Sequence, residues 1–304
     1  MLQAENKTIS GLLQEAAAYL DRKDIPFSRQ EAELLLSSLL SLRRIDLYTR
    51  PNQPVSTEQE MLFRDQIRRR GEHEPLQYIT GEVQFDGLSL IVQAGVFIPR
   101  PETEFIVEFV RTRLAPPRRV LDLCTGSGAL AIALAKRFPD AAVVATDDSE
   151  AALAVAQRNA ERHQCASRIT FLKGDLFQPV SGNGPFDLII CNPPYIPERD
   201  RSDLPPEVRD HEPAVALFAP EEGTAFYRRI LKESDSFLMP NGRLLLELGK
   251  GQSAWLERFV KEETSFSAAF IPDFAGIDRI AVCARRRIGQ ERERQPEVEG
   301  TGHG

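Results

Sequence analysis

The tetrapeptide Asn192-Pro193-Pro194-Tyr195, called here the acceptor segment, has the residue types needed to hold a planar NH2 group. Each proline fixes its own φ at about −65° and disfavours helix for the residue before it, so this backbone is stiff. Two acceptors, the Asn192 side-chain oxygen and the Pro193 carbonyl, can therefore keep fixed positions and bind both hydrogens of one NH2 group. Tyr195 adds an aromatic face on which that group can stack. A proline turn that merely ends a strand is the competing interpretation.

A glycine-containing loop earlier in the chain has the pattern of a nucleotide-binding turn. Residues 119–123 resemble a buried strand, residues 129–138 resemble a helix, and Cys124-Thr125-Gly126-Ser127-Gly128 connects them. Glycines let the backbone approach a ligand closely, and the start of the following helix presents free N–H groups. The pattern also satisfies a dinucleotide fingerprint, so the loop alone leaves a nicotinamide-dependent oxidoreductase open.

An acidic residue follows the second predicted strand of this region, residues 142–146. A carboxylate at that place can accept hydrogen bonds from both hydroxyls of a ribose. Asp147 is the candidate for this role and Asp148 is its competitor, because neighbouring side chains at a strand end point in opposite directions.

The third predicted strand, residues 169–173, is followed by Asp175 and Leu176. A carboxylate beside an apolar side chain suits the exocyclic amine and the face of an adenine. The polar residues that fall at four successive strand ends are Asp122, Asp147, Asp175 and Asn192. In a doubly wound sheet the carboxyl ends of the strands line one crevice, so these side chains are expected to share a site.

The amino-terminal residues 1–80 are predicted to form a small helical bundle domain, because apolar residues recur there at helical spacing. They contain no candidate catalytic residue, so substrate recognition is the function expected of them. The basic run Arg68-Arg69-Arg70 is interpreted as a solvated helix end, where cations are favoured.

A β-hairpin is predicted to link this bundle to the rest of the chain over residues 81–97, with Asp86-Gly87 as its turn. The hairpin is followed by Arg100, which two prolines hold in place. An arginine in a rigid segment can bind a carboxylate or phosphate through two N–H groups. The residues alone favour a surface arginine.

Residues 98–285 are predicted to form an α/β domain whose last two strands, 268–272 and 279–284, pair antiparallel across a short loop. The proline-rich segment 197–220 shows no periodicity and borders the acceptor segment, so it is interpreted as a substrate lip. Residues 286–304 are charged and nearly devoid of apolar side chains, which predicts a disordered tail.

The remaining predicted strands are residues 186–191, directly before the acceptor segment, and residues 243–248, which follow a predicted turn at residues 240–242. Seven strands with an antiparallel last pair are typical of the Rossmann-like class I S-adenosylmethionine (SAM) methyltransferases. The chain resembles one family of them, the PrmC/HemK glutamine methyltransferases of peptide-chain release factors. The resemblance extends over residues 8–285 and is carried by residues 74–81, 98–104, 122–128, 192–195 and 275–279. Many relatives carry glycine at the position of Cys124, but Gly126 and Gly128 are retained.

This resemblance implies transfer of the SAM methyl group to the side-chain nitrogen of the glutamine in a Gly-Gly-Gln motif of a release factor. The residues implied in binding SAM are Cys124, Thr125, Gly126, Ser127, Gly128, Asp147, Asp175, Leu176 and Asn192. The residues implied in catalysis are Asn192, Pro193 and Tyr195, and substrate binding adds Pro194 and Arg100. No metal is implied.

Three other functions, two enzymatic and one non-catalytic, are compatible with the acceptor segment and the glycine loop. A sister family methylates a glutamine of a large-subunit ribosomal protein, and enzymes that methylate exocyclic amines of nucleobases also use the acceptor segment. A non-catalytic binder that kept the fold is the third, although the intact acceptor segment and glycine loop argue against it.

The amino-acid composition bears on the remaining classes of protein function and on location. A formal net charge of −7 among 304 residues argues against a general nucleic-acid binder, and no direct nucleic-acid contact is expected. The four cysteines lie singly, without the spacing of a zinc site, and indicate reduced thiols in the cytoplasm. Neither a signal peptide nor a membrane span is recognised. We expect a monomer.

Overall fold

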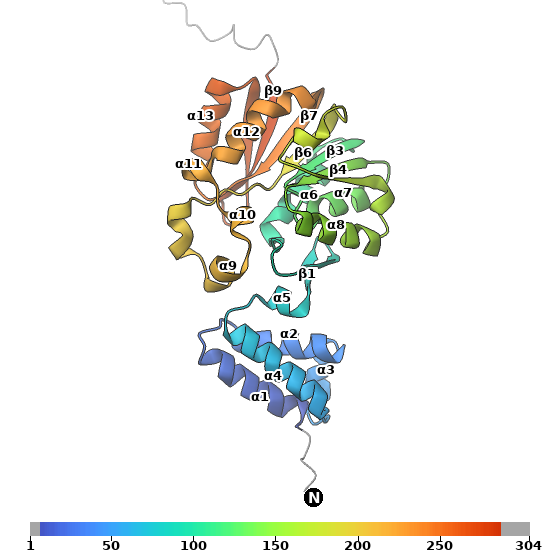
Figure 1. Ribbon diagram of the computed structural model, residues 1–304, viewed down its shortest axis with the longest axis vertical. Helices are drawn as coiled ribbons and strands as arrows, with labels where there is room; N and C mark the ends of the chain where they lie inside the picture. Colours follow the sequence, from blue (N-terminus) through green and yellow to red (C-terminus); the bar gives the residue numbers. More distant parts are fainter. Residues whose placement is uncertain (1–6, 287–304) are drawn as a thin grey trace, which may run out of the picture.

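Figure 1 shows the computed structural model of the chain, which describes residues 7–286. A group of helices occupies one end of the molecule and an α/β part occupies the other. The helices of the first part are α1 (Ile9–Asp21), α2 (Ser28–Leu40), α3 (Arg44–Thr49), α4 (Thr57–Gly71) and α5 (Leu76–Thr80). The predicted tail from residue 287 onward lies outside the described residues.

The helical part has an apolar core of its own, which confirms the prediction of a helical region. On α1 the buried positions recur every three or four residues, so one face of the helix is apolar. These positions pack against buried side chains of the neighbouring helices, among them Leu35, Leu36, Phe63 and Ile67. The start of α4 is fixed by a capping box in which Ser56 and Gln59 exchange hydrogen bonds.

The hairpin predicted between the two parts is present as β1 (Glu82–Phe85) and β2 (Leu88–Ile91), which pair antiparallel. Asp86 and Gly87 form its turn with φ of 45° and 74°. The side chain of Asn159 accepts from the Ile91 N–H at 2.7 Å and donates to the Ile91 carbonyl at 3.0 Å. The hairpin is therefore anchored to the α/β part, while Tyr78 of α5 packs against Val83 of β1 and links the hairpin to the helices as well.

A seven-stranded sheet in the order β5-β4-β3-β6-β7-β9-β8 forms the centre of the α/β part. Strands β3 to β7 are parallel, and β9 is antiparallel to both β7 and β8. The strands are β3 (Arg119–Leu123), β4 (Ala142–Asp147), β5 (Ile169–Lys173), β6 (Phe186–Cys191), β7 (Leu238–Glu247), β8 (Phe266–Pro272) and β9 (Asp278–Arg285). This topology confirms the predicted fold class.

Helices cover both faces of this sheet (Figure 1). The first set is α6 (Glu104–Arg113), α7 (Ala129–Arg137) and α8 (Glu150–Arg162), and the second is α12 (Ala225–Glu233) and α13 (Ser253–Glu263). Alternate residues of a strand point to opposite faces. Val120 accordingly packs in the first layer and Leu121 in the second. Burial on both faces explains why the central strands are continuous apolar runs.

Two segments for which the sequence predicts no helix or strand contain such elements in the structure. Residues 197–220 contain the 3-10 segment η4 (Glu198–Asp203), α9 (Pro206–His211) and α10 (Ala214–Leu217), and α11 (Pro220–Gly223) follows. The expected turn at residues 240–242 lies inside β7, whose register against β6 shifts between Phe186 and Leu188. This strand therefore bulges instead of starting after a turn.

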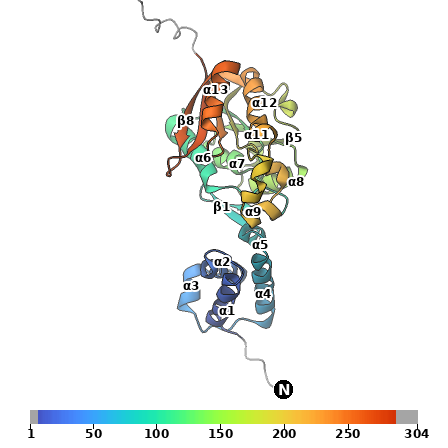
Figure 2. The ribbon, with the colours of Figure 1, turned by 90° about the vertical axis from the view of Figure 1, so that its left-hand side faces the viewer.

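The expectation of a solvated arginine run is wrong for Arg70, whose side chain is only 3% exposed. Its guanidinium donates to Glu31 of α2 at 2.9 Å and to Glu207 of α9 at 2.7 Å. Nearby, a ring nitrogen of His211 lies 3.3 Å from the Glu72 carbonyl. Figure 2 shows α9 at the end of the α/β part that faces the helices. Arg70 therefore connects the two parts.

Within residues 7–286, no helix is both long enough and apolar enough to cross a membrane.

Candidate active site

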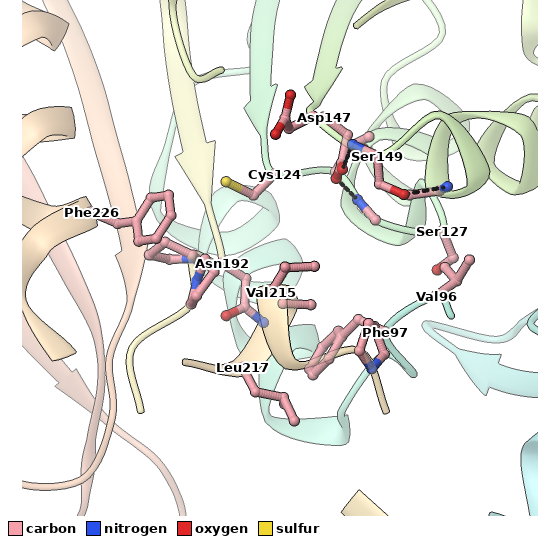
Figure 3. A pocket seen from close by; sticks show the side chains of 18 of the residues that line it. Val96, Phe97, Cys124, Ser127, Asp147, Ser149, Asn192, Val215, Leu217 and Phe226 are labelled. Carbon is pink, nitrogen blue, oxygen red and sulfur yellow. Dashed lines mark hydrogen bonds between the residues drawn. The ribbon is translucent and has the colours of Figure 1, made fainter. Parts of the chain in front are cut away.

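A cavity of about 700 Å³ opens where β3, β4, β5 and β6 end (Figure 3). This is the place in a doubly wound sheet where the chain reverses its winding direction and ligands bind. Among the residues predicted for the site, all but Gly128 line this cavity. The structure therefore brings together four strand ends that are widely separated in the sequence.

Asp147 fixes the conformation of the glycine loop. One of its oxygens accepts from the Gly126 N–H at 2.8 Å and the other from the Ser149 N–H at 2.9 Å. Figure 3 shows these bonds beside the cavity. A carboxylate oxygen has more than one acceptor site, so Asp147 retains the capacity to bind the hydroxyls of a ribose.

Asp122 is fully buried beneath the same loop. Its Oδ2 accepts from the Thr125 hydroxyl at 2.6 Å and from the Ala131 N–H at 3.1 Å, while Oδ1 has no partner among the described residues. Burial raises the pKa of Asp122 to about 7. An unpaired buried acceptor on the cavity wall suits a cationic group such as the amino group of SAM, so the residues present fit this cofactor.

Gly128 has a packing role. It precedes α7 with a φ of 84°, and a Cβ on it would lie 3.0 Å from the Cβ of Ala156 and from Cδ1 of Ile132. A side chain there would push α7 away from α8, so glycine is required for close packing. Cys124 also has a positive φ, of 56°, which glycine adopts without strain.

Asp175 and Leu176 follow β5 at the edge of the cavity. Leu176 is buried, whereas the Asp175 carboxylate forms an exposed ion pair with Arg229 of α12 at 2.7 Å. This pairing leaves Asp175 Oδ1 for a ligand, and the role of the two residues toward an adenine stays a prediction.

The acceptor segment follows β6 directly. Nδ2 of Asn192 donates to the hydroxyl oxygen of Thr103 at 3.1 Å, which leaves Asn192 Oδ1 available as an acceptor. The Tyr195 hydroxyl donates to Glu247 Oε1 at 3.2 Å, and the Tyr195 carbonyl accepts from Gln252 at 2.9 Å. Both ends of the segment are thus held by side chains from distant parts of the sequence.

The guanidinium group of Arg100 is bound by other residues of the same chain. It forms an ion pair with the buried carboxylate of Glu212, which also accepts from the Ile98 N–H at 3.3 Å. Its guanidinium lies 4.9 Å from the ring centroid of Phe97. Through Glu212, Arg100 therefore connects the segment 197–220 to the stretch that follows the hairpin, and its contact with a substrate stays a prediction.

Several residues of the site were given no role by the sequence. Thr103 and Glu247 orient the acceptor segment, while an apolar wall of the cavity comes from Phe97, Val215, Leu217 and Phe226 (Figure 3). Val215 is 78% exposed at the mouth of the cavity. Because α10 supplies Val215 and Leu217, the segment 197–220 borders the cavity as a lip would.

Comparison with known proteins gives matches over most of the chain. Residues 11–81 match the model described as PrmC N-terminal domain, and residues 88–204 match that of the methyltransferase small domain. The release factor glutamine methyltransferase of Geobacter sulfurreducens is 43% identical over 274 residues, which cover 90% of this chain and 95% of that protein. The protein of the same description from Nitratidesulfovibrio vulgaris is 38% identical over 286 residues, with coverages of 93% and 97%.

Among solved structures, the catalytic domain of hMettl16 in complex with MAT2A 3'UTR hairpin 6 superposes with a TM-score of 0.52 at 17% identity. The match covers 76% of this chain and 82% of that chain. It shows that the two chains share a fold.

Proposed function

Because the chain belongs to the family of release factor glutamine methyltransferases, we infer that it transfers a methyl group from SAM to a release factor. The acceptor atom is the side-chain amide nitrogen of the glutamine in the Gly-Gly-Gln motif. The observation that carries this inference is the acceptor segment beside the glycine loop, with Asn192 Oδ1 left available by the bond from Nδ2 to Thr103.

SAM supplies an electrophilic methyl group on a positively charged sulfur. The loop 124–128, Asp122 and Asp147 are the residues proposed to hold it, with Asp147 accepting from the ribose hydroxyls and Asp122 from the amino group. Thr125 and Gly126 keep the two carboxylates in place through their own hydrogen bonds.

The glutamine amide nitrogen is a poor nucleophile because its lone pair is delocalised into the carbonyl group. Asn192 Oδ1 and the Pro193 carbonyl accept its two N–H groups and direct the nitrogen toward the methyl carbon. The N–C bond forms as the C–S bond breaks, and the positive charge passes from sulfur to nitrogen. The two fixed acceptors stabilise that charge as it develops. The N-methylated amide then loses its proton to water, so no base is needed before transfer.

We propose that the helical part binds the release factor. No residue before Gly95 lines the cavity, so this part contributes no chemistry among the described residues. It does expose large apolar side chains, which a protein partner can cover: Phe27, Ile45, Tyr48, Met61 and Leu62.

The identity of the substrate can be tested with radiolabelled SAM. The protein is incubated in parallel with a purified release factor, a large-subunit ribosomal protein, DNA and RNA. Label is expected on the release factor only. A release factor whose Gly-Gly-Gln glutamine is replaced by alanine is the matched control and should remain unlabelled. Label on the ribosomal protein or on a nucleic acid, with none on the release factor, would overturn the assignment.

A further inference from the structure

Few hydrogen bonds can hold the backbone of the acceptor segment. Pro193 and Pro194 have no N–H group, so neither residue can donate a backbone hydrogen bond. At the start of the segment the chain is fixed, because β6 pairs with β3 up to Cys191 and the Asn192 side chain is bound to Thr103. The Pro193 carbonyl therefore keeps a defined position only if the chain after Pro194 is held as well.

Gln252, the residue before α13, supplies a bond at this second end. Its Nε2 donates to the Tyr195 carbonyl at 2.9 Å, and its Oε1 accepts from the Gly249 N–H at 2.9 Å. A backbone carbonyl can only accept and a backbone N–H can only donate. These two partners therefore define which end of the Gln252 amide carries the oxygen. The Tyr227 hydroxyl donates to the same Oε1 at 3.1 Å and restricts the side chain further.

Two glycines leave the space that this contact needs. A Cβ on Gly223 would lie 2.2 Å from the Tyr195 carbonyl oxygen. A Cβ on Gly249 would lie 2.6 Å from Gln252 Oε1 and 2.9 Å from Tyr195 Cδ2. Nonbonded atoms do not approach so closely, so a side chain at either position would displace the bond between Gln252 and Tyr195. Glycine permits the close approach of the backbone at both places.

We propose that Gln252 is a positioning residue for methyl transfer, which holds Tyr195, and with it the Pro193 carbonyl, against the substrate amide. The proposal rests on the proposed function, because it assigns this carbonyl and the Tyr195 ring to that amide. Tyr195 lines the cavity and Gln252 does not, so Gln252 acts through Tyr195. The bond from the Tyr195 hydroxyl to Glu247 restricts the ring, whereas Gln252 restrains the backbone.

Two substitutions of similar size test the donated hydrogen bond. Gln252→Glu keeps an acceptor for the Gly249 N–H, but its ionised carboxylate has no hydrogen to give to the Tyr195 carbonyl. Gln252→Met has a similar length and no donor at any pH. At about pH 8, with saturating SAM and release factor, both should lower kcat about tenfold, the loss expected for one hydrogen bond. The SAM Kd should stay unchanged in both variants, which also shows that they are folded.

The pH profile of the glutamate variant separates positioning from a general structural role. A protonated carboxyl has one hydrogen and can donate to the Tyr195 carbonyl again. The facing carbonyl oxygen raises the pKa of the introduced carboxyl, because it disfavours the charged form. The ratio of the variant kcat to the wild-type kcat should therefore rise as the pH falls from about 8 to about 6. Gln252→Met should show no such recovery.

The titratable groups bonded to Gln252 and Tyr195 do not account for such a rise. Burial raises the pKa of the Tyr195 and Tyr227 hydroxyls, so both stay protonated over this interval. Glu247 has a pKa of about 7 and titrates in the wild type as well, so division by the wild-type kcat removes its contribution.

Gln157→Glu is the matched control. Gln157 is exposed on α8, where its Nε2 donates to Glu161 at 2.9 Å. The substitution makes the same change of charge and removes one donated bond, but it lies outside the cavity and the acceptor segment. It should keep the wild-type kcat at each pH.

Three outcomes would overturn the proposal: wild-type kcat in either Gln252 variant at about pH 8, a rise in the SAM Kd as large as the loss of kcat, or a kcat ratio of the glutamate variant that does not rise on acidification. The wild-type enzyme is assayed in the same series. Failure of the wild type to methylate the release factor would instead overturn the proposed function.

Discussion

Two alanine substitutions in the glycine loop should have different consequences, although both glycines have positive φ. Gly126 has φ of 56° with no atom within 4 Å of a built Cβ, while Gly128 has φ of 84° with Ala156 and Ile132 at 3.0 Å. A left-handed conformation costs alanine about 1–2 kcal/mol at either position. Gly128→Ala adds an overpacking cost of about 1–3 kcal/mol, because α7 and α8 are in contact there. It should therefore be the less stable variant by about 2 kcal/mol.

The single tryptophan makes this difference measurable in the α/β part alone. Trp255 lies on α13, stacked on Phe259 at a centroid distance of 5.2 Å, so its fluorescence follows unfolding of that part. For a domain of this size, about 2 kcal/mol corresponds to about 4–8 °C in Tm. Gly128→Ala should therefore melt about 4–8 °C below Gly126→Ala in the absence of SAM.

The two variants should have the opposite order when their binding of SAM is compared. The open space beside Gly126 belongs to the cavity, so a methyl group there occupies volume proposed for SAM, whereas Gly128 does not line the cavity. Gly126→Ala should raise the SAM Kd more than Gly128→Ala at a temperature where both are folded. Equal Tm shifts, or a larger loss of binding in Gly128→Ala, would refute the assignment of Gly126 to the ligand and Gly128 to packing.

Three further outcomes are expected. Asn192→Ala should keep the SAM Kd and slow single-turnover methyl transfer about a hundredfold, by loss of about 3 kcal/mol of transition-state stabilisation; an unchanged rate would contradict its role. Glu207→Gln should weaken the connection between the two parts and raise KM for the release factor about fivefold, from a partly exposed charged hydrogen bond of about 1 kcal/mol. Glu198→Gln, which loses only an exposed pair in the same segment, is its control and should leave KM unchanged. Burial raises the pKa of Glu247 from 4.5 to about 7, so the folded state retains a proton that the unfolded state has lost, and stability falls as pH rises through that interval. The free energy of unfolding of Glu247→Gln should therefore increase relative to wild type from about pH 5 to about pH 8, and a constant difference would contradict the shift.

The parallel strands of the sheet could be predicted from the sequence because their signals are local. The strand β3, the glycine turn and α7 are contiguous, and each parallel strand buried on both faces is a short apolar run. The helices of the segment 197–220 were not predicted, for the same reason. Its helices α9 and α10 have six and four residues, too few for a 3.6-residue period to appear.

Arg70 shows why a local pattern cannot assign burial. It stands in a run of three arginines that are equivalent in the sequence, yet its partners Glu31 and Glu207 lie 39 and 137 positions away. The Asp235–Arg285 pair, 50 positions apart, was equally invisible. Only the tertiary arrangement distinguishes an ion pair between two parts of the molecule from a solvated helix end.

Contacts between distant residues are also missing from the predicted site. The sequence predicted the groups that face the cavity, but it did not predict the residues that orient them. Asn192 and Tyr195 have recognisable chemistry, whereas Thr103 and Glu247 are ordinary residues of a helix start and a strand end. Their bonds to the acceptor segment span 89 and 52 positions. Two prolines stiffen the backbone of that segment, but they leave the Asn192 amide free to turn about its own side-chain bond. A rigid backbone therefore does not by itself define which group meets the substrate, and the bond from Asn192 Nδ2 to the Thr103 hydroxyl oxygen supplies that constraint.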